Sequence, residues 1–286
     1  MNTNSISESG GGNSVVTKGD TPRLISNQFS FTEGPAVDRN GNVFFTDQPN
    51  DKIWKYGTDG TLTVFMDKTG RSNGMYFDKD GNLVTCADQQ NEIWSISPEK
   101  KVTVLFTDLN GKKINGPNDL WIHPAGGIYF TDPYYQRDWW TRKKADIEGE
   151  KVYYLPKGKR EAIAVADNLQ KPNGIIGTPD GKFLYVADIK GNKTFKYRIA
   201  EDGTLQDPQL FAEQGSDGMT IDNSGNLYLT GNGVTVYNSA GTKIQQIPVP
   251  EKWTANVCFA GKNRNQLFIT ASKSVYILDM LVKGVK

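Results

Sequence analysis

One recurring phrase constrains the fold of this chain more than any other feature. Its first copy runs from Glu33 to Asp47, and every copy opens with an acidic or amide residue. The copies open at Glu33, Asn73, Asn118, Asn173, Asp217 and, in a degenerate form, Asn256. These starts are 40, 45, 55, 44 and 39 residues apart. A period of roughly 40–45 residues made of short strand-like runs is typical of the blades of a β-propeller.

The first copy has the pattern of one antiparallel blade. Two apolar runs, 36–37 and 43–45, flank a polar turn in which Gly41 supplies the positive φ of a tight hairpin. Two more strand-like runs follow at 53–56 and 61–66. In five copies a glycine lies eight places after the opening residue: Gly41, Gly81, Gly126, Gly181 and Gly225. We therefore predict an all-β fold, a six-bladed β-propeller of four-stranded antiparallel blades.

The N-terminal part is predicted to close the ring. Residues 23–31 are strand-like and are expected to supply the outer strand of the last blade, which removes exposed sheet edges. A single propeller domain is predicted over residues 21–286, after a disordered head or linker over residues 1–20 that is rich in Ser, Gly and Asn. The head lacks the pattern of a signal peptide. It resembles a linker left after removal of an export or lipid-anchoring segment, which slightly favours an extracytoplasmic over a cytoplasmic location.

Composition argues against several classes of function. With 33 basic and 32 acidic residues the net charge is +1, so no basic footprint for nucleic acid is visible. No apolar run approaches the ~18 residues that a membrane span requires. Cys86 and Cys258 lie in apolar runs and are expected to be buried free thiols. The only histidine, His123, falls at a predicted turn, which removes Ser-His-Asp and Cys-His chemistry and argues against a zinc or iron centre.

The six opening residues are predicted to converge. The first strand of each propeller blade lies along the central channel, so the opening residues meet at one channel mouth. All six are carboxylates or carboxamides, which suit a hard cation. Asn-Gly and Asp-Gly pairs are common in turns, but recurrence at one ring position sets these six apart. Aspartates that end the second strands are predicted to support the ligands or to cap turns: Asp47, Asp88, Asp132 and Asp188.

The third copy contains an insertion where its neighbours have a short hairpin. Residues 133–144 are rich in aromatic and cationic side chains and are expected to overhang the channel mouth. Aromatic rings and cations in one loop suit the C–H faces and hydroxyls of a sugar-like ligand. The predicted substrate contacts are Asn73, Asn118, Tyr134, Tyr135, Arg137 and Trp139. A loop that packs on itself and a dimer contact are the alternatives.

A set of motifs carries a family resemblance. These are Glu-Gly-Pro at 33–35, Gly-Pro-Asn-Asp-Leu at 116–120, Tyr-Phe-Thr-Asp-Pro at 129–133, Pro-Asn-Gly at 172–174 and Ser-Asp-Gly-Met at 216–219. Over roughly residues 24–280 the chain resembles the gluconolactonase / senescence marker protein / luciferin-regenerating enzyme family. The resemblance implies a six-bladed propeller with a divalent cation, usually calcium, in the channel.

The resemblance also implies roles for individual residues. Glu33, Asn173 and Asp217 would be metal ligands, and Asn118 would be a fourth ligand or a substrate contact. Some relatives hold substrate with an arginine just before the Asn-Asp pair. Gly116 and Pro117 stand there in this chain, and Arg137 or Arg142 could take that role.

Together these observations predict a metal-dependent hydrolase that opens a sugar lactone such as gluconolactone to its hydroxy acid. Asp217 is the predicted general base. Ca²⁺ is the predicted ion, with Mg²⁺, Mn²⁺ and Zn²⁺ as alternatives for an open oxygen-lined site. The predicted partner is the small-molecule lactone alone, with the chain a monomer or weak dimer. Two interpretations stay open: hydrolysis of phosphotriesters or other esters in the same channel, and a non-catalytic propeller that binds a sugar or a protein.

Overall fold

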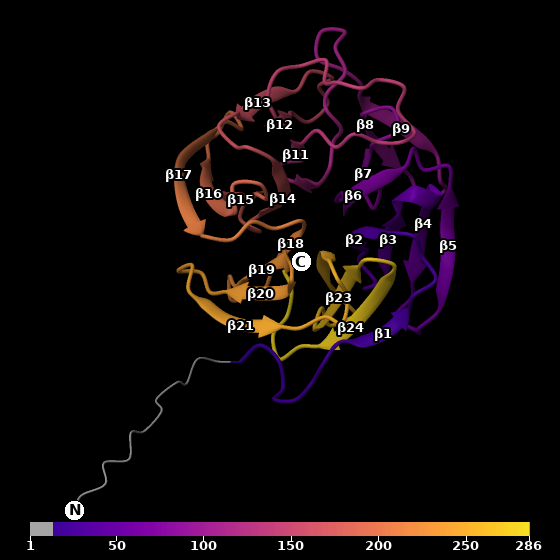
Figure 1. The fold of residues 1–286 in the computed structure, drawn as a ribbon, viewed down its shortest axis with the longest axis vertical. Coiled ribbons are helices and arrows are strands. Elements are labelled where there is room, and N and C mark those ends of the chain that lie inside the picture. The colour runs from indigo at the N-terminus through magenta and orange to yellow at the C-terminus, as the bar shows by residue number, and fades with distance from the viewer. Residues whose placement is uncertain (1–13, 286) are drawn as a thin grey trace, which may run out of the picture.

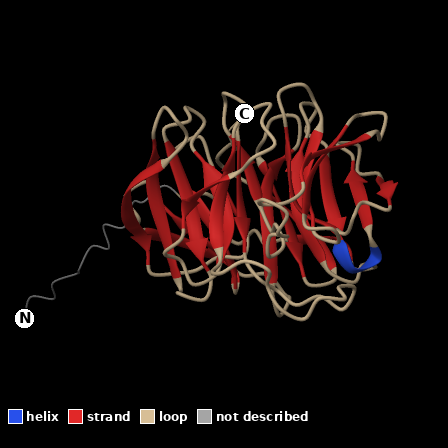
Figure 2. Cartoon of the chain, turned by 90° about the horizontal axis from the view of Figure 1, so that it is seen from above, coloured by secondary structure: helices blue, strands red, loops and turns tan. Residues whose placement is uncertain are grey.

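Six four-stranded antiparallel sheets surround a central axis in the computed structural model, which describes residues 14–285 (Figure 1). The strands run between two faces on which the connecting loops gather (Figure 2). The only helical element in this described range is the 3₁₀ turn η1 (Gln48–Asn50). The predicted six-bladed β-propeller is thus confirmed.

The first three blades follow one another along the chain. Blade 1 consists of β2 (Thr32–Val37), β3 (Val43–Asp47), β4 (Lys52–Tyr56) and β5 (Leu62–Asp67). Blade 2 consists of β6 (Ser72–Phe77), β7 (Leu83–Ala87), β8 (Glu92–Ile96) and β9 (Val102–Phe106). Blade 3 consists of β10 (Leu120–Ile122), β11 (Ile128–Asp132), β12 (Lys151–Leu155) and β13 (Ile163–Ala166).

The remaining blades complete the ring. Blade 4 consists of β14 (Pro172–Gly177), β15 (Phe183–Asp188), β16 (Lys193–Ile199) and β17 (Leu205–Ala212). Blade 5 consists of β18 (Met219–Ile221), β19 (Leu227–Gly231), β20 (Gly233–Tyr237) and β21 (Lys243–Ile247). Blade 6 consists of β22 (Thr254–Ala260), β23 (Gln266–Ala271), β24 (Ser274–Asp279) and, from the other end of the chain, β1 (Arg23–Ser26).

The N-terminal strand closes the ring as predicted. β1 pairs antiparallel with β24, where Arg23 lies opposite Ile277. Phe29, just after β1, packs edge-on against Phe45 and Trp54 of blade 1, with ring centroids 5.2 Å apart in both pairs. Burying side chains of this size contributes about 1.5–3 kcal/mol each. The closing segment therefore joins the last blade to the first through both hydrogen bonds and apolar packing.

The recurring glycine has the conformation that its position predicts. Gly41 has a φ of 88°, in the left-handed region that β-branched and bulky residues avoid. Asp38 Oδ1 accepts the backbone N–H groups of Asn40 and Asn42, each at 2.9 Å, which fixes the hairpin. The equivalent glycines have φ values of 87°, 94°, 72° and 80° at Gly81, Gly126, Gly181 and Gly225.

The chain from Ser14 onward packs against the propeller. Val15 and Val16 are buried in the apolar cluster of blades 5 and 6, and Val15 O accepts the Leu281 N–H at 2.9 Å. Residues 1–13 of the predicted head lie outside the described residues. Cys86 and Cys258 are buried free thiols, as predicted. Over residues 14–285, no helix is long and apolar enough to cross a membrane.

Candidate catalytic and metal site

The innermost strands of four blades are irregular at their first residues. The register with the second strand shifts between Glu33 and Ala36 in blade 1 and between Ser72 and Met75 in blade 2. Equivalent shifts lie at 172–175 in blade 4 and 254–256 in blade 6. A bulge releases residues from the strict alternation of a strand and can re-aim a side chain. The irregularity falls where the opening residues must leave the sheet and face the axis.

A glycine after the opening residue lets adjacent blades approach one another closely. A Cβ added to Gly34 would lie 1.9 Å from the carbonyl oxygen of Asn73, and one added to Gly74 would lie 2.4 Å from Asp119 Oδ1. A Cβ on Gly218 would lie 2.0 Å from Asn256 Cγ. Such distances exclude any side chain at these positions. The opening segments of adjacent blades are therefore in direct contact around the axis.

Three carboxyl groups meet where these segments converge, a place that we call the hub. Asn256 Nδ2 donates to Glu33 Oε2 and to Asp119 Oδ2, each at 3.3 Å. Burial raises the pKa of Glu33 well above its usual range, and the nearby charges of Asp217 and Asp119 raise it further. Burial also raises the pKa of Asp119 to about 7 and that of Asp217 to about 6. Acids arranged in this way favour a cation or retained protons.

Two buried amide oxygens of the opening residues have no hydrogen-bond partner within residues 14–285. Asn173 Nδ2 donates to the Tyr135 hydroxyl at 3.1 Å, which orients the amide and leaves its Oδ1 buried and unpaired. Asn73 Oδ1 is also buried and unpaired. A buried unpaired acceptor costs about 1–3 kcal/mol. Both acceptors would be satisfied by a positively charged ligand.

The donor set fits a hard cation. No group of three or more His, Cys, Asp or Glu residues between 14 and 285 could hold a metal by itself. A cation at the hub would thus depend on amide oxygens as well as on the carboxylates of Glu33 and Asp217. Calcium accepts such mixed oxygen ligands in irregular geometry.

Asp217 and Asn118 are held in different ways. Trp253 Nε1 donates to Asp217 Oδ2 at 2.6 Å, which orients that carboxyl group. Asn118 is held in place by its backbone. Its N–H donates to Thr131 O at 2.9 Å, and its carbonyl accepts the Gly74 N–H at 2.8 Å. The Asn118 side chain is buried at this position, only 7% exposed.

The insertion between β11 and β12 reaches across to two neighbouring blades. Tyr135 contacts Asn173 of blade 4, and Arg137 Nε donates to Asp88 Oδ2 of blade 2 at 2.7 Å. The Arg137 guanidinium lies 5.6 Å from the Tyr135 ring centre and 5.5 Å from that of Trp139. Arg137 also opposes the burial-driven rise in the pKa of Asp217, so its charge acts at the hub. The side of the insertion that carries these residues borders the site.

Arg142 and Tyr134 of the insertion are occupied by contacts with the segment before β10 and with the insertion itself. Arg142 Nη1 donates to Ile114 O at 2.9 Å, and its Nη2 donates to Asn115 O. Arg142 also lies 4.3 Å from the Trp140 ring centre, and the Tyr134 hydroxyl donates to Gln136 Oε1 at 2.7 Å. Of the two arginines considered as a substrate clamp, Arg142 is therefore occupied by backbone carbonyls, whereas Arg137 uses only its Nε in a hydrogen bond within the described chain.

Three of the four second-strand aspartates cap turns. Asp47 accepts the N–H groups of Ser30 and Phe31, and Asp132 accepts those of Asn115 and Gly116. Asp188 does the same for 170–171. Each fixes the loop that leads into the inner strand of its own blade. Asp88 differs, because its carboxylate accepts from Arg137 and from Gln48 Nε2.

Sequence reasoning did not single out Asp119, Trp253 or Lys171. Asp119 could have been found, because it occupies the place of Gly34, Gly74, Gly174 and Gly218 in other copies. Lys171 Nζ lies 4.4 Å from the Tyr135 ring centre and donates to Glu150 Oε1 at 3.1 Å. Trp253 and Lys171 stand outside the recurring phrase, so no sequence signal marks them.

A closed six-bladed ring with acids and amides gathered at one mouth defines a propeller with an oxygen-lined polar site. The chain belongs to the SMP-30/gluconolactonase/LRE-like family, whose model matches residues 31–273.

Individual relatives agree with this assignment. The chain is 29% identical to the gluconolactonase of Zymomonas mobilis, over 88% of this chain and 79% of that protein. It is 27% identical to lactonase drp35 of Staphylococcus haemolyticus, over 79% of this chain and 72% of that protein. The solved structure of a gluconolactonase from Xanthomonas campestris matches with a TM-score of 0.83 and 27% identity, covering 94% of this chain and 97% of that chain.

Proposed function

We propose that this protein hydrolyses a sugar lactone such as gluconolactone to its hydroxy acid, using Ca²⁺ held at the hub. One observation carries the proposal: the carboxyl groups of Glu33 and Asp217 lie together with the Asn173 amide, whose Oδ1 has no hydrogen-bond partner within residues 14–285. The relatives named gluconolactonase and lactonase support the substrate class.

Glu33, Asn173 and Asp217 would hold the cation, and Asn118 would supply a fourth oxygen. Two carboxylates would nearly neutralise a divalent ion, while amide oxygens add ligands without adding charge. When bound, the cation would polarise the lactone carbonyl and stabilise negative charge that develops on its oxygen. The irregular mixture of oxygen donors favours Ca²⁺ over Mg²⁺, which demands near-ideal octahedral geometry.

Asp217 is the general base in this proposal. The hydrogen bond from Trp253 Nε1 to Oδ2 orients the carboxylate. In the metal-free chain burial raises the pKa of Asp217 to about 6, and a bound cation would favour its ionised form, which can accept a proton. Asp217 takes a proton as the water oxygen bonds to the carbonyl carbon. Asp217 then gives this proton to the ring oxygen as the bond between that oxygen and the carbonyl carbon breaks. The ring oxygen thereby becomes a hydroxyl group of the product.

The insertion would bind and orient the sugar ring. Tyr135 and Trp139 present aromatic surface for its C–H faces, and Arg137 presents donors for its hydroxyls. Asp88 holds Arg137 Nε at 2.7 Å, so the guanidinium is oriented before substrate arrives. Gly116 cannot be replaced by an arginine in this arrangement, because a Cβ there would lie 2.7 Å from Asp88 Oδ1 and 2.8 Å from Trp140. Arg137 therefore takes the clamp role.

Metal-dependent turnover of a lactone panel tests this function. Acid release from gluconolactone is followed in a pH-stat, with uncatalysed hydrolysis subtracted, before and after chelation and after reloading with Ca²⁺, Mg²⁺, Mn²⁺ or Zn²⁺. We expect chelation to abolish turnover and Ca²⁺ to restore it best, with one ion per chain by elemental analysis. Full activity after chelation would contradict the proposed requirement for a metal ion in catalysis. Turnover of phosphotriesters but not of lactones would contradict the substrate class.

A further inference from the structure

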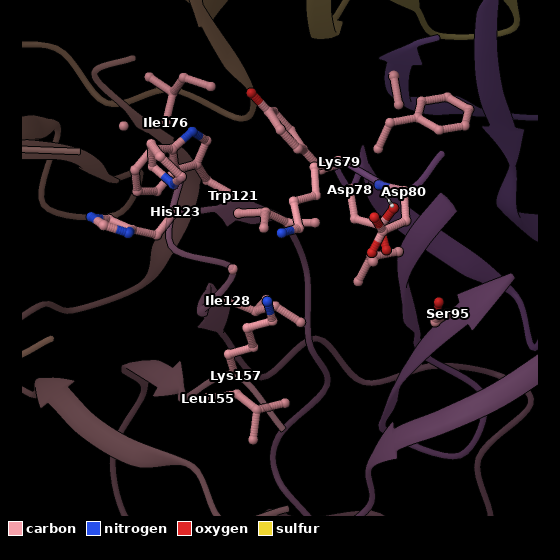
Figure 3. A pocket seen from close by; sticks show the side chains of 18 of the residues that line it. Asp78, Lys79, Asp80, Ser95, Trp121, His123, Ile128, Leu155, Lys157 and Ile176 are labelled. Carbon is pink, nitrogen blue, oxygen red and sulfur yellow. Dashed lines mark hydrogen bonds between the residues drawn. The ribbon is translucent and has the colours of Figure 1, made fainter. Parts of the chain in front are cut away.

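A second cavity, of about 720 Å³, lies at the opposite mouth of the channel (Figure 3). In each blade its lining begins two or three residues beyond the hub residue along the inner strand: Pro35, Tyr76, Trp121, Ile176, Thr220 and Cys258. At about 3.3 Å per strand residue, this is roughly 7–10 Å further along the axis. We call it the far-mouth cavity. It is separate from the proposed catalytic site.

The walls of the far-mouth cavity are largely apolar. It extends from the axis into the groove between blades 2 and 3, where Val84 and Val104 face Ile128 and Leu155. Trp121, Ile128 and Leu155 line this region in Figure 3. A volume of this size falls within the about 300–1,000 Å³ typical of small-molecule pockets.

Charged groups around the cavity are mostly cationic. Its lining includes six cations, Arg39, Lys79, Lys157, Lys159, Arg160 and Arg264, but two carboxylates, Asp78 and Asp80. None of these cations forms an ion pair with any carboxylate of the described chain. The Asp78 carboxylate is already occupied, since Oδ1 accepts the N–H groups of Asp80 and Asn82 at 2.8 Å. The cavity therefore offers uncompensated positive charge.

Arg264 brings an unused donor to this cavity. Its Nη2 donates to Asp38 O at 2.6 Å, but its Nη1 is buried without a partner in the described structure. Burial raises the pKa of Tyr76 and Cys258, and the Arg264 charge opposes this rise in both. Since both residues line the cavity, the guanidinium lies at its wall. A buried unpaired donor costs free energy that an anionic ligand would recover.

His123 does not supply a further ligand. Its Nδ1 accepts the Ala125 N–H at 3.0 Å, and its Nε2 lies 3.0 Å from Gly181 O. Both ring nitrogens are thus engaged by backbone groups of the hairpins, as a turn role predicts. The polar recognition at this mouth depends on the arginines and lysines.

We propose that the far-mouth cavity binds a small organic anion with an apolar body, namely a carboxylate or sulfonate on an aliphatic or aromatic frame. The anionic group would pair with Arg264 and Lys79, and the body would lie on Trp121 and in the groove between blades 2 and 3. A neutral sugar lactone lacks both features, so the ligand differs from the proposed substrate. The proposal does not depend on the proposed function.

Fluorescence titration with 8-anilinonaphthalene-1-sulfonate tests this proposal on the full chain in the presence of a chelator. We expect saturable binding at one site per chain, displaced by decanoate and not by decyltrimethylammonium, which has the same chain length and the opposite charge. Displacement by both amphiphiles alike, or no saturable binding, would overturn it.

Variants locate the binding. Val104→Trp fills the groove, and Lys79→Glu with Lys157→Glu reverses two charges, so each variant should weaken probe binding at least tenfold. The matched control is Lys112→Glu with Lys113→Glu, since these exposed lysines do not line the far-mouth cavity. Its affinity should equal that of the wild type. Equal affinity in all variants, with unchanged thermal midpoints, would place the probe elsewhere and overturn the proposal.

Discussion

The two mouths of the channel are made from the same six inner strands, yet they carry opposite chemistry. At one mouth four of the strands begin with a shift in register, and the acids Glu33, Asp119 and Asp217 gather there. At the other they end in regular hairpins, and cations such as Lys79 and Arg264 border apolar walls. Within the hub, Asn256 donates hydrogen bonds to both Glu33 and Asp119.

This comparison shows that position along the strand decides the chemistry. In blade 1 a register shift releases Glu33 from the strict alternation of the strand, whereas Asp119 and Asp217 stand just before the first residues of β10 and β18. The cavity lining begins two or three residues beyond the opening residues, so the acid and cation clusters lie at different levels of the channel. The two mouths should therefore respond separately to substitution.

The largest expected effect is a loss of turnover caused by a substitution at the acidic mouth. Asp217→Asn should lower kcat by about 10²–10⁴-fold, because it removes the proposed general base but keeps an oxygen at the site. Probe binding at the far mouth should not change. The control is Asp138→Asn, an exposed carboxylate in the insertion, which should keep wild-type turnover in the pH-stat. Undiminished hydrolysis by the Asp217 variant would remove this residue as the base.

Next in size is the stabilisation that the cation provides. At a Ca²⁺ concentration of 100 times its Kd, the wild type should gain about 2.7 kcal/mol in the free energy of unfolding. Glu33→Gln should lose most of this gain, measured by urea unfolding with and without Ca²⁺. In chelator the same variant should be more stable than the wild type at neutral pH, since it removes a carboxyl group whose pKa burial raises.

Glu148→Gln is the matched control for Glu33, because Glu148 is exposed in the insertion. It should keep the full stabilisation by Ca²⁺. Equal stabilisation of the Glu33 variant would show that the hub does not hold the ion through this residue.

A smaller effect concerns the substrate clamp. Arg137→Lys should raise KM by about tenfold, a loss of roughly 1.4 kcal/mol, because an ammonium cannot bond Asp88 and a sugar hydroxyl with the geometry of a guanidinium. kcat should change less than KM. Arg160→Lys at the far mouth provides the control, with both constants unchanged. A wild-type KM in the Arg137 variant would exclude this residue as the clamp.

A separate expected effect is a pH dependence of the metal-free protein. Burial raises the pKa of Asp119 to about 7, above its ordinary value of 3.8. Between those values the folded chain keeps a proton that the unfolded chain releases, so the stability contributed by Asp119 is full below pH ~4 and falls as pH rises toward 7. Asp119→Asn should flatten this fall. Urea midpoints of both proteins in chelator, from pH 5 to 8, measure it, and parallel curves would contradict the assignment.

Much of the fold followed from local rules in the sequence. The sequence predicted a positive φ at Gly41 and its equivalents, and it predicted that the strand-like segment at 23–31 closes the ring. Both predictions were confirmed. The convergence of Glu33, Asn73 and Asp217 at one mouth followed from their equal place in the repeat. These features depend on short-range patterns that recur in each copy of the repeat.

Contacts between distant parts of the chain could not be predicted in this way. Asn256 bonds Asp119 across 137 residues, and Arg137 bonds Asp88 across 49. Trp253 reaches Asp217 from the segment before β22, outside the recurring phrase. The place of a residue within the repeat does not determine which distant side chain it contacts. That pairing depends on where loops of different length cross the mouth of the channel.

The sequence by itself therefore determined the number of blades, their hairpins and the ring of acid and amide residues. Each of these features recurs once in every repeat, and each repeat forms one blade. Only the tertiary structure decided which acids share Asn256, which arginine stays free to bind, and that the opposite mouth holds an apolar cavity bordered by cations. Those outcomes depend on the distances between blades and on the course of the insertion, which close packing of the whole ring fixes.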